Sequence, residues 1–304
     1  MEVIEMVELE QQFERIGVPQ RNGGADLHTH TTASDGVCIP LENIRLAKEA
    51  GLDAIAITDH DTTAGLAEAS LEAKRIGIHL IPGVEISTVE QGIDIHVLGY
   101  YVNPEDKSFV DHLLELRKTR DVRNEMMVAR LTELGIPLTM EEVIAELPNP
   151  LQEGETVGRP HMADALVRRG VVANMKEAFD RYLGKEGLAY VNPPRITPLT
   201  AANWIREAGG AVVLAHPGLY GDDVLVERIV REIQPDGIEV WHSDHTDADV
   251  NRYIEMADAY GLLKTAGSDF HGARQGKVFH GALGSRRIGM GIVESLRVIA
   301  DSRK

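Results

Sequence analysis

Near the start of the chain lies the pentapeptide Asp-Leu-His-Thr-His at positions 26–30, directly after a short apolar run. Thr-Asp-His-Asp at 58–61 and Ser-Asp-Phe-His at 268–271 also follow apolar runs of strand length. On a strand, residues two apart point to the same side, so His28 and His30 can reach one metal ion. The Asp and His of the third string can do the same from another strand. Three such strings predict a metal centre at the carboxyl ends of strands.

Apolar runs suited to buried strands recur along the chain and mostly alternate with helical patterns. The runs are Ala25–Leu27, Ala54–Ile57, Leu80–Ile86, Ile93–Tyr100, Ala211–Ala215, Gly237–Trp241 and Leu262–Ala266. Repeated alternation of strand and helix with short connections implies a parallel sheet. About seven such strands suit a closed or nearly closed barrel, so the predicted fold class is an α/β barrel of seven strands.

The alternation stops at Tyr101, and an almost entirely helical region follows as far as about Arg195. The helices expected there are Asp106–Leu134, Met140–Leu147, Pro160–Gly170 and Met175–Leu183. Beyond them, Thr197 is predicted to cap a helix, Pro198 to occupy its first position and Gly209–Gly210 to end it. The predicted organisation is an N-terminal arm at 1–23, a catalytic barrel at 24–100 and 197–304, and a helical insertion at 101–196 that covers the barrel mouth as a substrate lid.

The composition is that of an ordinary soluble protein, with 43% hydrophobic and 26% charged residues among 304. No apolar run approaches the roughly 20 residues of a membrane span. A single cysteine, Cys38, excludes an internal disulfide, and with an acidic N-terminus it favours the cytoplasm. The net charge of −17 argues against broad affinity for nucleic acid. The insertion carries 13 Lys+Arg against 16 Asp+Glu and the remainder 18 against 32, so an anionic substrate is expected to meet the insertion.

Nine histidines and carboxylates lie at or just beyond the carboxyl ends of the expected strands: His28, His30, Asp35, His60, Glu85, His96, His216, Asp269 and His271. Nitrogen and oxygen ligands without thiolates favour Zn²⁺, Mn²⁺ or Fe²⁺. Nine ligands exceed what one ion takes, so two or three ions that share bridging groups are implied, and Glu85 is the natural bridge. Such ions activate water and stabilise both oxygens of an in-line displacement, as in phosphoester or amide hydrolysis.

Other polar residues near the strand ends have competing interpretations. Three histidines are predicted to be structural or exposed rather than ligands: His79, His112 and His280. His96 lies in an apolar strand, but its parity matches the polar positions of that strand, which favours a ligand over a core residue. Asp59 and Asp61 flank a predicted ligand and are expected to orient it. For His242 and His245, metal ligation and substrate contact are equally open.

A Gly-Arg-Pro-His string at 158–161 in the insertion predicts a phosphate site. Pro160 can open a helix and Gly158 lets the backbone approach a ligand, while the free N–H groups of a helix start favour anions. Arg159 and His161 would then converge on phosphate, because guanidinium forks match phosphate oxygens. Further candidates for substrate contact are Arg123, Lys185 and His245, with Arg120 beside them. For the arginines and the lysine, a solvated helix face is an equal alternative.

These motifs resemble the PHP family, the polymerase-and-histidinol-phosphatase superfamily of metal-dependent phosphoesterases. The matching pattern is His-x-His, Asp or His, Thr-Asp-His, Gly-x-Glu, a strand His, Ala-His-Pro and Asp-x-His, and it runs from position 26 to 271. The resemblance implies a distorted seven-stranded (β/α)7 barrel with a trinuclear site whose ligands fall on the nine residues above. Position 35 is aspartate here, where some members have histidine. Catalytic roles are assigned to Asp35, His60, Glu85 and His216.

The sequence of the insertion narrows the resemblance to one branch of the family. Val-Gly-Arg-Pro-His at 157–161 and the stretch Ala178–Val191 are similar to a bacterial branch that includes nucleoside 3′,5′-bisphosphate phosphatases and 5′-to-3′ exoribonucleases. The leading hypothesis is a metal-dependent phosphoesterase that hydrolyses a phosphomonoester of a small phosphorylated metabolite, above all a nucleotide. The alternatives are a 5′-3′ exonuclease on short single-stranded RNA ends, an amidohydrolase-type C–N hydrolase and a non-catalytic module, although the complete ligand set argues against the last. No membrane contact and no protein partner are predicted.

Overall fold

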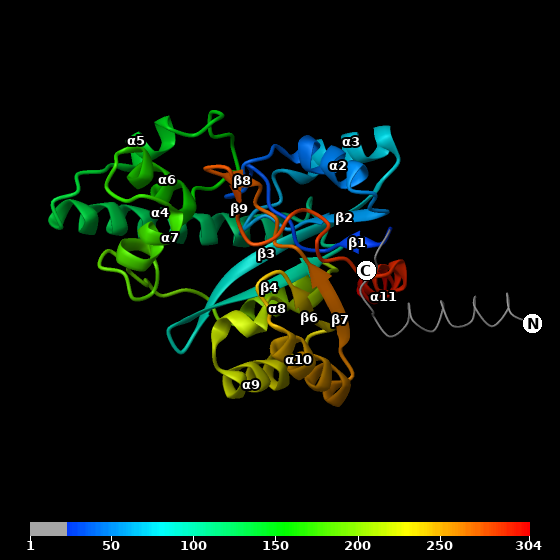
Figure 1. Ribbon diagram of the computed structural model, residues 1–304. Coiled ribbons are helices and arrows are strands. Elements are labelled where there is room, and N and C mark those ends of the chain that lie inside the picture. Colours follow the sequence, from blue (N-terminus) through cyan, green and yellow to red (C-terminus); the bar gives the residue numbers. More distant parts are fainter. Residues whose placement is uncertain (1–22) are drawn as a thin grey trace, which may run out of the picture.

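The computed structural model describes residues 23–304, so the predicted N-terminal arm, apart from Gly23, lies outside the described residues. One sheet of seven strands, ordered β1 to β7, lies at the centre of the molecule (Figure 1). The strands are β1 (Ala25–Asp26), β2 (Ala54–Ile57), β3 (His79–Glu90), β4 (Ile93–Tyr100), β5 (Ala211–Leu214), β6 (Gly237–His242) and β7 (Leu263–Gly267). Each strand overlaps its predicted run, and the predicted seven-stranded α/β architecture is confirmed.

Strand β4 departs from the parallel arrangement that the sequence predicted. β1, β2 and β3 are parallel neighbours, as are β5, β6 and β7, but β4 is antiparallel to both β3 and β5. Two residues with positive φ, Gln91 (52°) and Gly92 (76°), join β3 to β4 as a tight hairpin. Parallel strands need a long crossover. The expectation of a parallel sheet is therefore wrong for β4.

The two edges of the sheet meet just beyond the strand ends and nearly close the barrel. The Leu27 amide donates to the Ala266 carbonyl at 3.1 Å, and the His30 amide donates to the Phe270 carbonyl at 2.9 Å. Thr29 and Phe270 also form an isolated parallel bridge. The first and last of the three ligand-bearing strings are thus held side by side.

Helices cover the outside of the barrel and fill one of its ends. They are α2 (Pro40–Glu49), α3 (Leu66–Ile76), α8 (Pro198–Glu207), α9 (Asp223–Ile233), α10 (Asp247–Tyr260) and α11 (Met290–Asp301). Figure 1 shows α2 and α3 on one side of the sheet and α8, α9 and α10 on the other. Ile292 and Leu296 of α11 share a core with Ala25, Ala54 and Ala211, the first residues of three strands. α11 therefore fills the amino end of the barrel and leaves the carboxyl end for a site.

Helix α8 begins and ends as its sequence predicted. The Thr197 hydroxyl accepts a hydrogen bond from the Thr200 amide at 3.3 Å, and Pro198 is the first helical residue. Gly209 follows the helix with φ of 73°, a conformation that glycine adopts without a steric penalty. These signals return the chain from the insertion to strand β5.

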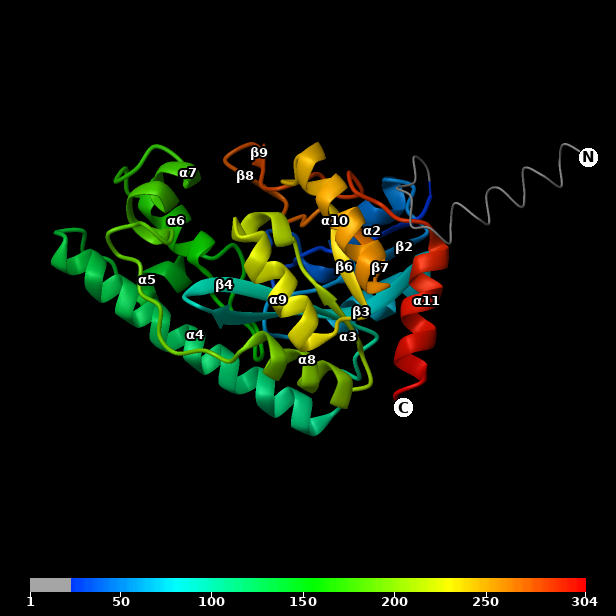
Figure 2. The ribbon, with the colours of Figure 1, turned by 90° about the horizontal axis from the view of Figure 1, so that it is seen from below.

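Residues 101–196, between β4 and α8, form a helical insertion whose outer part has its own hydrophobic core. Its helices are α4 (Lys107–Glu133), α5 (Met140–Ala145), α6 (Arg159–Arg168) and α7 (Met175–Ala178), and a π-helical turn, η1 (Phe179–Leu183), follows α7. Met127, Leu131, Met162 and Leu166 belong to a core separate from those of the barrel. Figure 2 shows α4 running along one side of the molecule, from below the barrel strands out to the far end of the insertion. No helix among the described residues is long and apolar enough to cross a membrane.

Backbone and side-chain contacts fasten this insertion to the loops at the carboxyl ends of the strands. The Thr156 amide donates to the Ala33 carbonyl at 3.0 Å, and the Thr62 hydroxyl donates to the Gly154 carbonyl at 2.6 Å. On the other side, Arg274 of the β8–β9 hairpin (β8, Ala273–Arg274; β9, Lys277–Val278) lies 2.8 Å from Asp164 of α6. The insertion is therefore anchored next to the end of the barrel where the ligand-bearing strings lie.

Candidate metal centre

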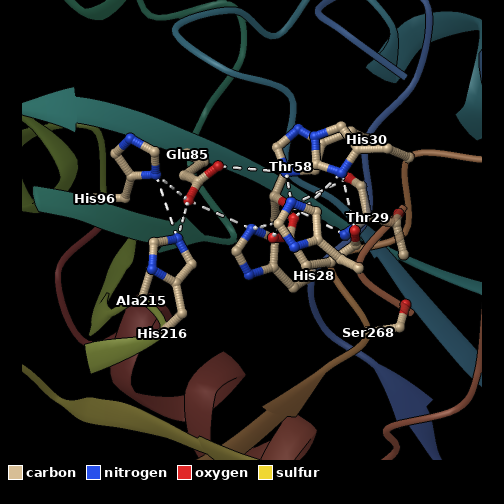
Figure 3. Close-up of polar contacts among 12 residues, drawn as sticks. His28, Thr29, His30, Thr58, Glu85, His96, Ala215, His216 and Ser268 are labelled. Carbon is tan, nitrogen blue, oxygen red and sulfur yellow. Dashed lines mark hydrogen bonds and ion pairs between the residues drawn. The ribbon is translucent and has the colours of Figure 1, made fainter. Parts of the chain in front are cut away.

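Glu85 lies at the middle of the predicted ligands. It is a residue of β3 with 1% exposure, and its two oxygens face different histidines. Oε1 lies 2.8 Å from His96 Nδ1 and 3.0 Å from His216 Nε2. Oε2 lies 3.0 Å from His60 Nδ1 and 3.3 Å from His30 Nε2. Figure 3 shows His96 and His216 converging on Glu85 from one side, with His30 on the other. One carboxylate thus joins two groups of imidazoles.

Asp269, just after β7, is a second shared carboxylate. Its Oδ1 lies 3.4 Å from His28 Nε2 and 3.2 Å from His30 Nε2, while its Oδ2 lies 3.2 Å from His242 Nε2. The backbone of Asp269 has a φ of 54°, which is costly for a residue other than glycine. Strain of this kind concentrates at functional sites. Here it accompanies a carboxylate that faces three histidines.

Asp35 completes a third group from the loop that follows β1. Its Oδ1 lies 3.2 Å from His271 Nε2 and 3.8 Å from His30 Nδ1, and its Oδ2 lies 3.8 Å from His60 Nε2. Gly158, at the start of α6, packs directly against this carboxylate, since a Cβ there would lie 3.0 Å from Asp35 Oδ2. The glycine therefore lets the insertion approach the ligands closely.

The donor atoms at this centre fit divalent metal ions. Six buried atoms of the predicted ligands have no hydrogen-bond partner among the described residues: His28 Nε2, His30 Nε2, Asp35 Oδ1, His60 Nδ1, His216 Nδ1 and Asp269 Oδ1. Buried polar atoms are normally paired, and metal ions satisfy imidazole and carboxylate donors of this kind. Groups of three or four residues with donor atoms within 4.8 Å of one another together include all nine predicted ligands. The groups overlap, because His28, His60 and Glu85 each belong to at least two.

Two aspartates behind the ligands hold the loops that carry them. Asp59 accepts hydrogen bonds from the Thr31 amide and hydroxyl, both at 2.7 Å, and from the Ser34 hydroxyl at 2.6 Å. It thereby fixes the loop that leads to Asp35. Asp61 accepts from the Ser87 amide at 2.8 Å. Among the described residues, no hydrogen bond joins either aspartate to His60, the ligand that they were expected to orient, so they hold the neighbouring loops instead.

Four arginines of the insertion line the same pocket, of about 220 Å³, as the predicted ligands: Arg120, Arg123, Arg159 and Arg195. Arg120 lies 2.5 Å from Asp61, and Arg159 and Arg195 both pair with Asp94 of β4. Arg123 is buried and pairs with no carboxylate among residues 23–304. Its Nη2 donates to Asn124 at 3.2 Å, and its Nε has no partner there.

The charges on this wall of the pocket are unbalanced. Burial, together with the neighbouring Arg120, Arg159 and Arg195, holds the pKa of Arg123 well below its usual value. Burial raises the pKa of Asp94, but its two arginine partners outweigh burial and keep that pKa below the ordinary range. Four guanidinium groups thus face two carboxylates, which leaves an excess positive charge opposite the ligands.

Comparisons with known proteins agree with this geometry. The model of the PHP domain family matches residues 26–194, more than half of the chain. A 3′,5′-nucleoside bisphosphate phosphatase of Chromobacterium violaceum is 36% identical over 257 residues, which cover 83% of this chain and 88% of the relative. The chain belongs to the PHP family.

Two further PHP relatives extend over most of the chain. The 5′-3′ exoribonuclease Rnm of Salmonella typhimurium is 35% identical over 252 residues, 81% of this chain and 84% of the relative. Among solved structures, a protein of Bifidobacterium adolescentis that has been proposed to be a metal-dependent phosphoesterase superposes with a TM-score of 0.83. It is 32% identical, and the match covers 93% of this chain and 98% of that structure. The whole barrel and the insertion are therefore shared features.

The structure does not bring all predicted substrate contacts of this PHP chain into the pocket. His161 accepts a hydrogen bond from the Gly158 amide at 3.0 Å through Nδ1, and it lines a different pocket. Burial lowers the pKa of His161 to about 4. Lys185 is exposed and is not among the residues that line the metal pocket. His245 uses both ring nitrogens on backbone atoms, the Val240 carbonyl at 2.8 Å and the Gly218 amide at 3.1 Å. His161 and His245 therefore have local structural roles, and Lys185 is a surface residue outside the pocket.

The sequence analysis missed Arg195, His280 and Glu239, which the structure places around the PHP site, and it left the role of His242 open. Arg195 lines the pocket, and its Pro-Pro-Arg context gave no signal of this. His280, expected to be structural or exposed, lines the pocket with Nε2 3.6 Å from Asp269 Oδ2. His242 faces the same oxygen, so of its two interpretations the structure favours a place at the metal centre. Glu239 is fully buried behind the ligands, and a carboxylate within the apolar run Gly237–Trp241 was the signal.

Proposed function

We propose that this chain is a metal-dependent phosphoesterase that hydrolyses a phosphomonoester of a small phosphorylated nucleotide. The observation that supports it most is that one pocket combines the predicted metal ligands with an arginine wall, which consists of Arg120, Arg123, Arg159 and Arg195. Ligands without arginines would suit several hydrolytic reactions, whereas guanidinium groups beside them favour an anionic substrate, since their geometry matches phosphate and carboxylate oxygens. The substrate class follows the relatives, among which are a nucleoside bisphosphate phosphatase and an exoribonuclease.

We further propose that the centre holds two or three Mn²⁺, Fe²⁺ or Zn²⁺ ions. Glu85 and Asp269 would hold neighbouring ions, because each directs its oxygens at separate histidines. When bound, such ions supply Lewis-acid activation of water and offset the charge of phosphate oxygens. Asp35, His60 and His216, which line the pocket, would complete the catalytic side of the site.

The protein's own contribution to phosphate binding would come from residues 101–196, acting as a lid. Arg123 is buried and offers guanidinium N–H groups that no carboxylate of the described residues neutralises. Arg159 and Arg195 are held in place by Asp94 and stay on the pocket wall. Fixed donors of this kind bind a phosphate at low cost, because they need no reorganisation when the substrate arrives. A nucleoside 3′,5′-bisphosphate could place one phosphate at the ligands and the other at the arginines.

Two alternatives have different support. The exoribonucleases among the relatives favour hydrolysis at the 5′ end of short single-stranded RNA. The pocket, of about 220 Å³, is smaller than the roughly 300–1,000 Å³ of typical small-molecule sites, so it would enclose a phosphorylated end and leave the remainder of a nucleotide or of an RNA strand outside. A C–N hydrolase would use the same ligands, but it would leave the arginine wall without a purpose.

Turnover of a matched substrate panel tests the proposal. The Mn²⁺-loaded protein is incubated with adenosine 3′,5′-bisphosphate, AMP, a 5′-phosphorylated ribotrinucleotide and a cyclic amide, and phosphate, nucleotide and carboxylate products are measured. The bisphosphate should give the highest kcat/KM, with phosphate and a nucleoside monophosphate as products.

The other outcomes of the panel are equally informative. Release of mononucleotides from the RNA, with no phosphate from the bisphosphate, would establish the exonuclease alternative instead. Hydrolysis of the amide alone would contradict a phosphoesterase. The Asp269→Asn protein is the control for contaminating phosphatases, because it keeps the shape of a predicted ligand and removes its charge.

A further inference from the structure

Glu239 is a completely buried carboxylate that does not line the pocket of the candidate metal centre. It lies on β6, where Ile238 and Val240 on either side of it are also fully buried. An ionised group in such surroundings is stable only if hydrogen bonds satisfy its oxygens. Both of its oxygens point at predicted metal ligands: they lie 3.1 and 3.2 Å from His28 Nδ1, and Oε2 accepts from the His216 amide at 2.8 Å.

The contact with His28 determines which ring nitrogen of that residue carries the hydrogen. An ionised carboxylate only accepts hydrogen bonds, so Nδ1 must donate, and Nε2 is the nitrogen whose lone pair a neutral His28 ring can offer to a metal ion. His28 Nε2 is one of the buried atoms without a hydrogen-bond partner, and it lies 3.4 Å from oxygens of both Glu85 and Asp269. The hydrogen bond on one nitrogen of a histidine sets the metal-binding ability of the other.

The contact with His216 fixes a strained piece of backbone. His216 has a φ of 20° and a ψ of 58°, outside the regions that non-glycine residues prefer. Such a conformation persists only where surrounding contacts impose it. The hydrogen bond from its amide to Glu239 is a contact of this kind, and the His216 side chain then reaches Glu85 at 3.0 Å.

Gly267 provides independent support for a site built around this carboxylate. A Cβ at this position of β7 would collide with His28 Cβ and would lie 2.5 Å from Glu239 Oε1. Glycine is the only residue that leaves room for the pair. The close packing confines both side chains to the observed arrangement.

We propose that Glu239 is a positioning residue that sets His28 in its Nδ1–H form and anchors His216, so that one carboxylate of β6 prepares ligands carried by β1 and β5. This inference deepens the proposed metal centre and rests on it. Outer partners of this type change metal affinity by about 10- to 100-fold when they are removed. Glu239 would thus contribute to metal binding without touching the metal.

The decisive variant is Glu239→Gln, which keeps the shape and replaces one acceptor oxygen by an NH2 donor. If the remaining oxygen accepts from the His216 amide, the NH2 group faces His28 Nδ1 and favours the Nε2–H form, which has no free lone pair toward the ligands. ¹⁵N-histidine NMR of the metal-free protein, recorded at a pH high enough that the His28 ring is neutral, reads this tautomer directly, with His28→Gln used to assign the signals. We expect Nδ1–H in the unmodified protein, a shift toward Nε2–H in the variant, and an apparent Kd for Mn²⁺ raised at least about tenfold.

The control is Thr265→Val, at the position of β7 paired with Glu239, where the hydroxyl donates to the Ile238 carbonyl and not to a ligand. It should leave the tautomer and the Mn²⁺ affinity unchanged. If Glu239→Gln does not fold, Glu239→Asp decides, because it should weaken Mn²⁺ binding where Thr265→Val does not. An unchanged tautomer and unchanged affinity in Glu239→Gln would overturn the proposal, as would unchanged affinity in Glu239→Asp. Neither readout needs a substrate, so a failed phosphoesterase assay would refute the proposed function and leave this test intact.

Discussion

Two regions contribute to one pocket in different ways. One is the barrel rim, by which we mean the strands and following loops that carry the nine predicted ligands, and the other is the insertion. On the rim, seven ligands follow the carboxyl ends of β1, β2, β5 and β7, whereas Glu85 and His96 lie inside β3 and β4 and not at the strand ends that the sequence predicted for them. The structure brings together all nine residues. On the insertion, three of the five candidate contacts, Arg120, Arg123 and Arg159, reach the pocket, together with the unpredicted Arg195, while His161 and Lys185 do not. A strand end dictates where its side chains point, whereas a helix face points wherever tertiary packing turns it. The ligands on the rim are therefore predictable from sequence, whereas the substrate contacts on the insertion are predictable only in part.

Removing metal should have the largest effect, because every rim residue acts through it. Chelation followed by dialysis should abolish turnover of the bisphosphate, and added Mn²⁺ should restore it. The fold should survive, since the hydrophobic cores of the barrel contain none of the nine ligands. Circular dichroism of the metal-free protein is the control. If protein that lacks metal by mass spectrometry shows full turnover, the rim residues do not act by holding metal ions.

Removing the charge of a carboxylate that faces several histidines should cause the second-largest loss of activity. Glu85→Gln and Asp269→Asn keep the side-chain shape and remove the charge that faces the histidines. We expect kcat to fall by at least about 10²-fold, in keeping with the contribution of precise positioning. Metal content, measured in parallel, should also fall. Near-normal kcat in both variants would rule out the role given to the rim.

The rim and the insertion also show what a sequence can predict. Strands were predictable because buried runs end abruptly in polar strings, and within a strand parity selected His96, while Glu85 was identified as a carboxylate in an apolar run. The antiparallel strand β4 was not, because a two-residue hairpin at Gln91 and Gly92 gave a weaker signal than the surrounding strand–helix alternation. His280 lies in an irregular segment, where no periodicity shows which way a side chain faces. Its place beside Asp269 is decided by tertiary packing alone.

Replacing Arg123 should separate binding from stability. Arg123→Met removes a buried guanidinium that no described carboxylate balances, so kcat/KM should fall by about 10- to 100-fold through loss of roughly 1.5–3 kcal/mol of charge-assisted contact. The same change should stabilise the fold by about 1 kcal/mol, because apolar replacement of a buried charge is often favourable. Thermal unfolding should then occur about 2–4 °C higher, with unchanged metal content.

Arg130 provides the matched control for this variant, on the same helix. It is half-exposed and pairs with Glu133 at 2.7 Å, away from the pocket. Arg130→Met should change neither kcat/KM nor the unfolding temperature by more than a small amount. Normal kinetics in Arg123→Met would remove Arg123 from the phosphate site.

Arg159 should show the smallest effect of the pocket residues, and Lys185 none. Arg159 is already paired with Asp94 at 3.0 Å, so part of its charge is offset before a substrate arrives. Arg159→Ala should lower kcat/KM for phosphorylated substrates by about tenfold, the lower end of the range for a charged contact. Lys185→Ala should match the unmodified protein, since this side chain is exposed outside the pocket. Equal losses in both variants would mean that the insertion acts through general charge instead of defined contacts.

The most direct test of the shared pocket is anomalous diffraction from crystals soaked in Mn²⁺ and inorganic phosphate. Data at the manganese absorption edge locate the ions without assumptions about the protein. We expect two or three manganese peaks among the rim ligands around Glu85 and Asp269, with phosphate between them and Arg123. Manganese outside this cluster, or phosphate bound away from the arginine wall, would contradict the account.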